Sequence, residues 1–242
     1  MKLTPIIRYY KKNTTVKIKD ISALDDIKWK TDLSSDNNDY TFSFVPKQDI
    51  KEDGSVGIKI DFEAWSVDNY VLMPAAVYNG NRFKTFKMDY PPLIMVKEAY
   101  DVNMPPHQND VPRLNIDPGN SKIQLLAGDM STPCIAIFFK DKKESLFVFG
   151  PEQVSGFECG YEIEESQDRK SAFLTVMAPG VRSGLKYWGM KMETESKDRG
   201  RTFTLGETIS LPLGIYIDKC ENIEDFMPFL FSTERYIIKG KL

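Results

Sequence analysis

Residues 65–83 read WSVDNYVLMPAAVYNGNRF, and the apolar run at their centre guides the interpretation of the surrounding chain. Residues 71–77 are almost continuously apolar, which is typical of a strand covered on both faces. Pro74 has no N–H to donate to a ladder, so it indicates a sheet edge or a bulge. Asn79-Gly80 favours a tight hairpin turn. The stretch therefore predicts a buried strand that ends in a turn.

Strand patterns continue outward from this stretch in both directions. Apolar residues occupy every second position in residues 40–44, 56–64 and 209–217. Because side chains alternate across a strand, each set lies on one face of a sheet and leaves the opposite face wet. We predict a turn at Asp53-Gly54, just ahead of the second segment.

Short apolar runs separated by Gly, Pro or charged turns follow after residue 120. We predict strands at 122–126, 134–139, 145–149, 157–163 and 171–178. About ten short strands with regular turns are typical of a sandwich or barrel. The predicted fold class is therefore all-β, with antiparallel strands, and residues 84–120 form a long irregular connection rich in proline.

One helix is predicted, at the C-terminal end of the chain. Asn222 is placed to cap it, with Asp225 three residues later. The apolar stripe at helical spacing consists of Ile223, Phe226, Phe229 and Leu230. Pro228 fits only if the helix starts late or bends. We expect one β-sandwich domain over residues 1–220 and a linker helix over residues 221–242.

The charge and hydropathy of the chain exclude several partners. Its net charge is only −3 with both signs mixed, whereas a nucleic-acid partner usually needs a concentrated basic face. No apolar run approaches the roughly 20 residues of a membrane span. The start, MKLTPIIRYYKK, lacks the apolar segment of a secretory signal, so the protein is either cytoplasmic or has lost a leader.

The usual catalytic and metal-binding patterns are missing. His107 is the single histidine and lies in a Pro-flanked loop, and no serine sits in a GxSxG turn. Cys134, Cys159 and Cys220 are far apart and odd in number, so we expect buried thiols and no zinc site. We predict no cofactor.

Several charged and polar residues suggest a calcium site, a salt bridge or a catalytic pair. Asp110, Asp117 and Asn120 share the long connection but lack EF-hand order, so calcium is a minor alternative. Arg113 and Asp129 are better interpreted as internal salt-bridge partners. Glycoside hydrolysis needs two carboxyl groups, and Glu162 and Glu164 project to one strand face. Alternation explains this pair as part of a solvated outer face.

A sugar ring has an apolar C–H face and a rim of hydroxyls, so aromatic rings next to planar polar side chains suit it. Residues 78–83 and 65–70 both offer that mixture. The candidate carbohydrate-binding residues are Tyr78, Asn79, Asn81, Arg82, Trp65 and Asp68. The alternative is a hairpin end with core aromatics, because Asn-Gly needs no functional reason to occur in a turn.

Three segments together support a resemblance to a known group of proteins. They are DNYVLMPAAVYNGNRF (68–83), DVPRLNIDPG with AGDMSTP (110–119 and 127–133), and DRGRTFTLGETISLPLGIYI (198–217). They resemble the N-terminal β-sandwich region of large, uncharacterised glycosidase-like proteins from Bacteroides-type gut bacteria. In such proteins a supersandwich precedes an (α/α)6 toroid of the six-hairpin glycosidase type.

The resemblance implies a galactose-mutarotase-like supersandwich of two sheets. It implies that the C-terminal helix connects to a helical catalytic domain that this chain lacks, and that the protein is periplasmic or secreted. The expected function is a non-catalytic domain of a glycoside hydrolase that supports the catalytic domain and contacts glycan. The alternative is a free-standing carbohydrate-binding module. A mutarotase of similar fold needs histidines, and His107 alone does not supply them.

Overall fold

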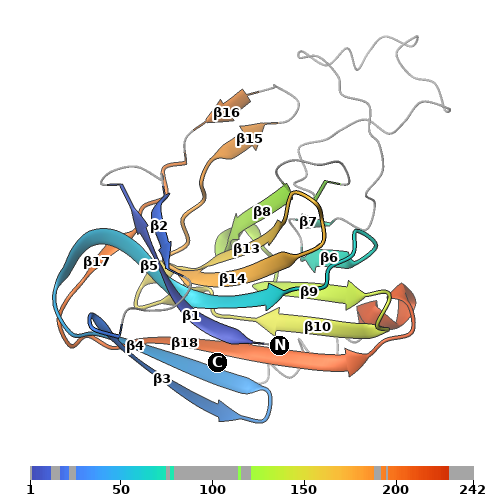
Figure 1. Cartoon of the computed structure of the whole chain (residues 1–242), viewed down its shortest axis with the longest axis horizontal. Helices are drawn as coiled ribbons and strands as arrows, with labels where there is room; N and C mark the ends of the chain where they lie inside the picture. The colour runs from blue at the N-terminus through green and yellow to red at the C-terminus, as the bar shows by residue number, and fades with distance from the viewer. Residues whose placement is uncertain are drawn as a thin grey trace.

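A computed structural model describes residues 2–11, 17–21, 26–74, 77–78, 114–115, 121–187, 192–194 and 196–228. These residues form two antiparallel sheets, which we call sheet A and sheet B, packed face to face (Figure 1). The predicted all-β, two-sheet antiparallel fold is therefore confirmed. In the described part of the chain no helix is long and apolar enough to cross a membrane.

Sheet A has the strand order β2-β1-β5-β14-β13-β8, and β17 also pairs with β5. Its strands are β1 (Leu3–Tyr10), β2 (Lys17–Ile21), β5 (Ile50–Phe62), β8 (Ser121–Leu126), β13 (Gly160–Glu165), β14 (Ala172–Ala178) and β17 (Arg201–Phe203). Pairs such as β13 with β14 are neighbours in the chain, whereas β14 with β5 joins segments more than a hundred residues apart.

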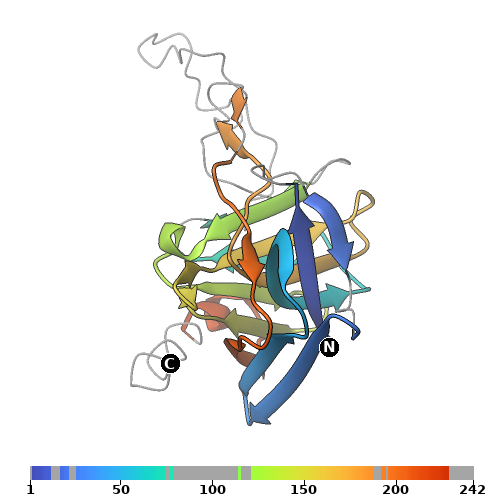
Figure 2. The same ribbon diagram turned by 90° about the vertical axis from the view of Figure 1, so that its left-hand side faces the viewer.

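Sheet B has the order β3-β4-β18-β10-β9-β6-β7. Its strands are β3 (Trp29–Asp36), β4 (Asp39–Pro46), β6 (Tyr70–Met73), β7 (Val77–Tyr78), β9 (Cys134–Phe139), β10 (Glu144–Phe149) and β18 (Ile209–Lys219). Two hairpins lie outside these sheets: β11 (Gln153–Val154) with β12 (Phe157–Glu158), and β15 (Leu185–Tyr187) with β16 (Met192–Thr194). The β15–β16 hairpin stands away from the sandwich in both views (Figures 1 and 2).

The core lies between the sheets and is built from the predicted alternating residues. Val56, Ile58 and Ile60 of β5 are at most 1% exposed, and Leu211 of β18 faces them with no exposed surface. Burying each of these side chains contributes about 1.5–3 kcal/mol to folding. All six residues of β9 are buried, as its continuous apolar run predicts, because a second apolar layer covers its outer face.

The turn predicted at Asp53-Gly54 is wrong, because both residues lie inside β5. Gly54 pairs with Tyr9 of β1 and with Arg201 of β17. A Cβ at this position would lie 3.0 Å from the backbone oxygen of Arg8, which is tighter than ordinary contacts. The glycine therefore permits close approach of three strands, and its turn propensity is not used.

The chain reverses once ahead of the turn predicted at Asn79-Gly80. Leu72 of β6 pairs with Tyr78 of β7, so the chain reverses between Met73 and Val77 and divides the predicted 71–77 strand. Pro74 follows β6 directly, next to the β7 edge of sheet B, as a residue without an N–H requires. Residues 79 and 80 themselves lie outside the described residues.

A helical turn over residues 223–228 follows β18. Asn222 Oδ1 accepts hydrogen bonds from the N–H groups of Glu224 (2.8 Å) and Asp225 (3.0 Å), which confirms the predicted cap. Phe226 is fully buried on the outer face of sheet B, where its ring stacks on Phe147 at 5.1 Å. Ile223 of the predicted stripe is 40% exposed, and the stripe's last two residues lie outside the described part.

Candidate functional site

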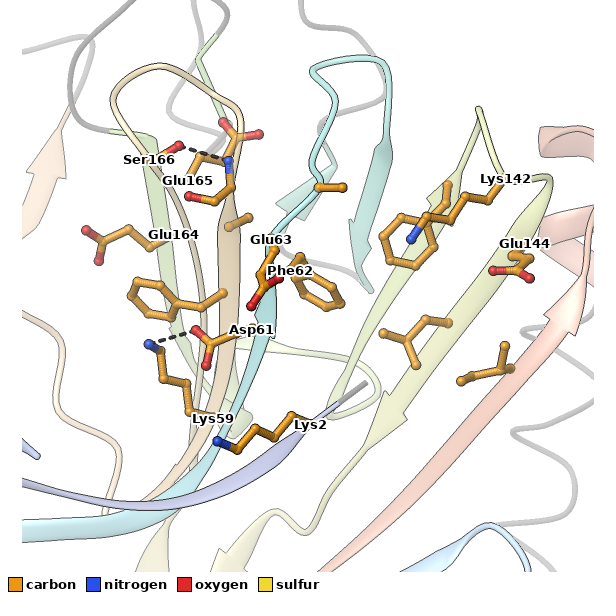
Figure 3. A pocket seen from close by; sticks show the side chains of 17 residues that line it. Lys2, Lys59, Asp61, Phe62, Glu63, Lys142, Glu144, Glu164, Glu165 and Ser166 are labelled. Carbon is orange, nitrogen blue, oxygen red and sulfur yellow. Dashed lines mark hydrogen bonds and ion pairs between the residues drawn. The ribbon is translucent and has the colours of Figure 1, made fainter. Parts of the chain in front are cut away.

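A cleft of about 1030 Å³ opens at the end of the sandwich where β5 and β9 finish and β10 and β14 begin (Figure 3). It is lined from both sheets, so its walls come from distant parts of the chain. The lining residues are Lys2, Lys59, Asp61, Phe62, Glu63, Ala64, Phe139, Lys142, Glu144, Leu146, Glu164, Glu165, Ser166, Ser171, Ala172, Phe173 and Ile217. The volume is in the range of small-molecule sites, although the cleft is widely open to solvent.

Aromatic rings form the floor of the cleft. The half-buried Phe62 ring packs against Trp65 and Phe139, with ring centroids 5.6 Å apart in both pairs. Trp65 meets Phe139 edge to face at 6.1 Å and is only 8% exposed. Its indole N–H donates to Glu165 Oε1 at 2.6 Å, which satisfies the one polar atom of the ring. Trp65 therefore supports the cleft floor from beneath.

Lysine side chains lie over two rings at the cleft, Phe173 and the Phe139 ring of the floor. Lys59 Nζ is 4.7 Å from the centroid of Phe173 and 2.8 Å from Asp61 Oδ1, so the carboxylate holds the ammonium in place. Lys142 Nζ lies 5.2 Å from the centroid of Phe139. Each contact is a cation–π interaction at a solvent-accessible site, which is worth about 0.5–1 kcal/mol.

The buried carboxylate of Glu165 organises one wall. Its Oε2 accepts a hydrogen bond from Ser121 Oγ at 2.5 Å and lies 3.4 Å from Arg169 Nε. Arg169 in turn donates to the backbone oxygen of Asn115 at 3.0 Å. Through these contacts Glu165 ties Trp65, the start of β8 and the 114–115 segment to the cleft.

Glu162 lies outside the cleft, on the outer face of sheet A, and its predicted solvated position is wrong. It is 4% exposed, and its Oε1 accepts from Arg8 at 2.6 Å. Gln124 donates to its other oxygen, and Lys122 Nζ lies 3.7 Å away. Segment 181–184 contributes to this face, because the Ser183 N–H donates to Gln124 Oε1.

The electrostatics of Glu162 argue against an acid catalyst. Burial by itself raises the pKa of its carboxyl group, but attraction to Arg8 and Lys122 and two hydrogen bonds outweigh burial. The pKa of Glu162 therefore lies below its ordinary value. Glu164, two residues on, is half-buried and pairs with Lys122 at 3.6 Å. With its pKa lowered, Glu162 is not arranged as the protonated acid that glycoside hydrolysis requires.

The structure brings one of the six predicted carbohydrate-binding residues to the cleft, as support for its floor, and that residue is Trp65. Asp68 is exposed and lies 3.6 Å from Lys140. The structure describes the backbone of Tyr78 but not its side chain, and Asn79, Asn81 and Arg82 lie outside the described residues. Their proposed contact with carbohydrate stays a prediction.

Other predicted roles have mixed outcomes. Asp129 is an internal salt-bridge partner, as predicted, because its Oδ2 lies 2.9 Å from Arg182. The three cysteines are buried free thiols, as predicted. His107, Arg113 and the calcium candidates Asp110, Asp117 and Asn120 lie outside the described residues. Among the described residues no group of three or more His, Cys, Asp or Glu side chains is arranged to hold a metal ion.

Sequence reasoning missed Phe62 and Phe173 as candidate functional residues. Phe173 carried a usable signal, because it occupies the outward position of a strand whose Ala172, Leu174 and Val176 point into the core. An aromatic residue on the wet face of a strand is a better indicator of a binding surface than one in the buried set.

Neither a protein-family model nor a curated protein matches this chain. Among solved structures, the Slr1438 protein from Synechocystis sp. PCC 6803 aligns at a TM-score of 0.40 and 12% identity, over 76% of this chain and 53% of that protein. This chain therefore spans about half the length of that protein. A protein from Escherichia coli K12 described as a "Putative aldose 1-epimerase" aligns at a TM-score of 0.44 and 9% identity, over 90% and 84%. Similarities this distant carry no argument about function.

Proposed function

We propose that this chain is a non-catalytic, carbohydrate-contacting β-sandwich domain that supports the catalytic domain of a glycoside hydrolase. The observation that carries the proposal is the cleft at the end of the sandwich. Its half-buried Phe62 and Phe173 rings offer apolar surface for the C–H face of a sugar. Lysine, serine and carboxylate groups around them offer donors and acceptors for hydroxyls.

A binding screen with purified protein tests this function. Glycan microarrays identify a ligand, and isothermal titration calorimetry then compares Phe173→Ala with wild type. We expect Phe173→Ala to lose about 5- to 30-fold in affinity, because removal of one stacked ring costs about 1–2 kcal/mol. Absence of binding to every glycan on the array would overturn the proposal.

Phe157→Ala is the matched control. Phe157 is 39% exposed and lies under Arg201 with the guanidinium carbon 4.8 Å from its centroid, as Phe173 lies under Lys59. Both substitutions therefore remove a surface ring and a cation–π contact, but Phe157 does not line the cleft. Affinity should remain within about twofold of wild type in Phe157→Ala.

A free-standing carbohydrate-binding module is the second candidate, and one observation favours it. Phe226 of the C-terminal turn is fully buried against this sandwich's own Tyr70, Phe138 and Phe147. That turn thus has an apolar partner without a neighbouring helical domain. The coding sequence downstream of the Leu242 codon separates the two candidates. An open frame rich in amphipathic helices supports the glycoside hydrolase, and a stop codon supports the module.

A further inference from the structure

The charges that line the cleft are largely neutralised within the protein. Lys59 pairs with Asp61 at 2.8 Å, which removes one charge of each sign. Glu165 is compensated by Arg169 at 3.4 Å from beneath the wall. Glu164 is compensated by Lys122 at 3.6 Å, on the outer face of sheet A.

Four charged side chains of the lining have no such compensation. Two are positive and two are negative, so their charges sum to zero. Lys2 and Lys142 carry positive charges, and Glu63 and Glu144 carry negative charges. None of the four has an ion-pair partner among the residues that the structure describes. Figure 3 shows Lys142 and Glu144 on one side of the cleft and Glu63 towards its centre, so the signs are interspersed.

A ligand that carries charges of one sign gains little from such a lining. Attraction to two groups is offset by repulsion from two others, and each exposed contact is worth only about 1 kcal/mol in water at 4 Å. A hydroxyl group, by contrast, both donates and accepts. It can accept from a lysine ammonium and donate to a glutamate carboxylate, so a mixed lining suits a polyol.

We infer that the cleft selects an uncharged glycan, with its lysine and glutamate groups acting as hydrogen-bonding groups to hydroxyls. This inference rests on the proposed carbohydrate function and adds the ligand class to it. Glu63 and Glu144 would repel uronate or sulfate groups. Lys2 and Lys142 would repel the ammonium of an unacetylated amino sugar.

The test compares neutral and charged polymers at two salt concentrations. The probes are neutral glucans, galactans and mannans, the anionic polygalacturonate and its methyl ester, and the cationic chitosan oligomers and their N-acetylated forms. We expect binding only by uncharged members of this panel. We also expect less than about a twofold change in affinity between about 20 mM and about 500 mM NaCl, a range over which exposed charge pairs are strongly screened.

The possible results distinguish a failure of this inference from a failure of the proposed carbohydrate function. Tight, salt-sensitive binding of polygalacturonate or chitosan would overturn the uncharged class and leave carbohydrate binding standing. Failure of every polymer and oligosaccharide to bind would overturn the carbohydrate function and the inference with it.

Charge-removing variants provide an independent measurement. Glu63→Gln/Glu144→Gln leaves the lining with excess positive charge, and we expect it to gain salt-sensitive binding to polygalacturonate. Lys2→Gln/Lys142→Gln should gain binding to chitosan for the opposite reason. All four positions are exposed, so the variants should fold normally. An unchanged preference in both variants would contradict the charge-balance argument.

Discussion

At the residue scale, the sequence pattern predicts the sheet face of Glu162 but not its burial. Alternation of the buried Cys159, Tyr161 and Ile163 identifies the face that Glu162 occupies, and that face is the outer face of sheet A, as predicted. Alternation carries no information about what covers the face. Here Arg8 from β1 and Gln124 from β8 meet Glu162, and the segment with Ser183 adds cover.

Removal of the Glu162 charge should be strongly destabilising. Glu162→Gln removes the carboxylate that pairs with the buried Arg8 guanidinium, so we expect a loss of about 3 kcal/mol in the free energy of unfolding. Urea denaturation at pH 7 measures it. Glu164→Gln, on the same face but about one-third exposed, is the control and should cost less than about 1 kcal/mol. Equal effects of the two substitutions would contradict the buried pair.

The same pair predicts a pH dependence. Because the pKa of Glu162 is lower in the folded state, the pair's contribution is present above the unfolded pKa of about 4.3 and is lost as pH falls through the folded pKa. The stability gap between wild type and Glu162→Gln should therefore be constant near neutrality and close on acidification. Unfolding curves from about pH 7 down to about pH 3 measure this gap. A stability gap that widened on acidification would contradict the lowered pKa of Glu162.

The cysteine thiols give a second residue-scale prediction. Burial, with a smaller effect of Glu158, raises the pKa of Cys159 to about 12, and burial also raises the pKa of Cys220. Cys134 has no exposed surface. Since the thiolate is the reactive form, Ellman's reagent at pH 8 should label none of the three in the native protein. Guanidinium should release all three, and rapid native labelling would contradict their burial.

At the element scale, the sequence predicted the C-terminal turn better than the hairpin near Pro74. The Asn222 cap is a local signal within four residues, and its hydrogen bonds form as expected. The β6–β7 reversal was not predicted, because a continuous apolar run looks like one long strand and does not indicate where the chain turns. Gly54 was misread for a related reason, since only the pairing of β1, β5 and β17 reveals its close contacts.

Phe226 should hold the C-terminal turn on sheet B. Phe226→Ala removes a fully buried ring from a cluster that includes Phe147 and Phe138, and we expect a loss of about 3–4 kcal/mol in stability. Thermal denaturation with near-UV circular dichroism measures the loss and the change in aromatic packing. Ile223→Ala, in the same turn but 40% exposed, should cost less than about 1 kcal/mol. A small effect of Phe226→Ala would mean that the turn is not docked.

At the scale of the whole molecule, the cleft was not predictable from local motifs. Its walls combine the ends of β5 and β9 with the starts of β10 and β14. Strand register within each sheet and the packing of the two sheets bring these together. The sequence favours residues 78–82 as a binding site because aromatic and amide groups cluster there along the chain. A site assembled from strand ends has no such cluster, although the outward-facing Phe173 hinted at it.

The whole-molecule arrangement also predicts that this chain alone does not hydrolyse glycosides. Glu162 is buried, holds three polar partners and has a lowered pKa, so it cannot serve as the proton donor that a leaving group needs. Aryl-glycosides incubated with the purified chain should show no turnover above the rate of a heat-denatured sample. Turnover that disappears in Glu164→Gln, a variant expected to fold normally, would identify a catalytic carboxyl at the cleft. That result would replace the supporting role proposed for this sandwich with an enzymatic one.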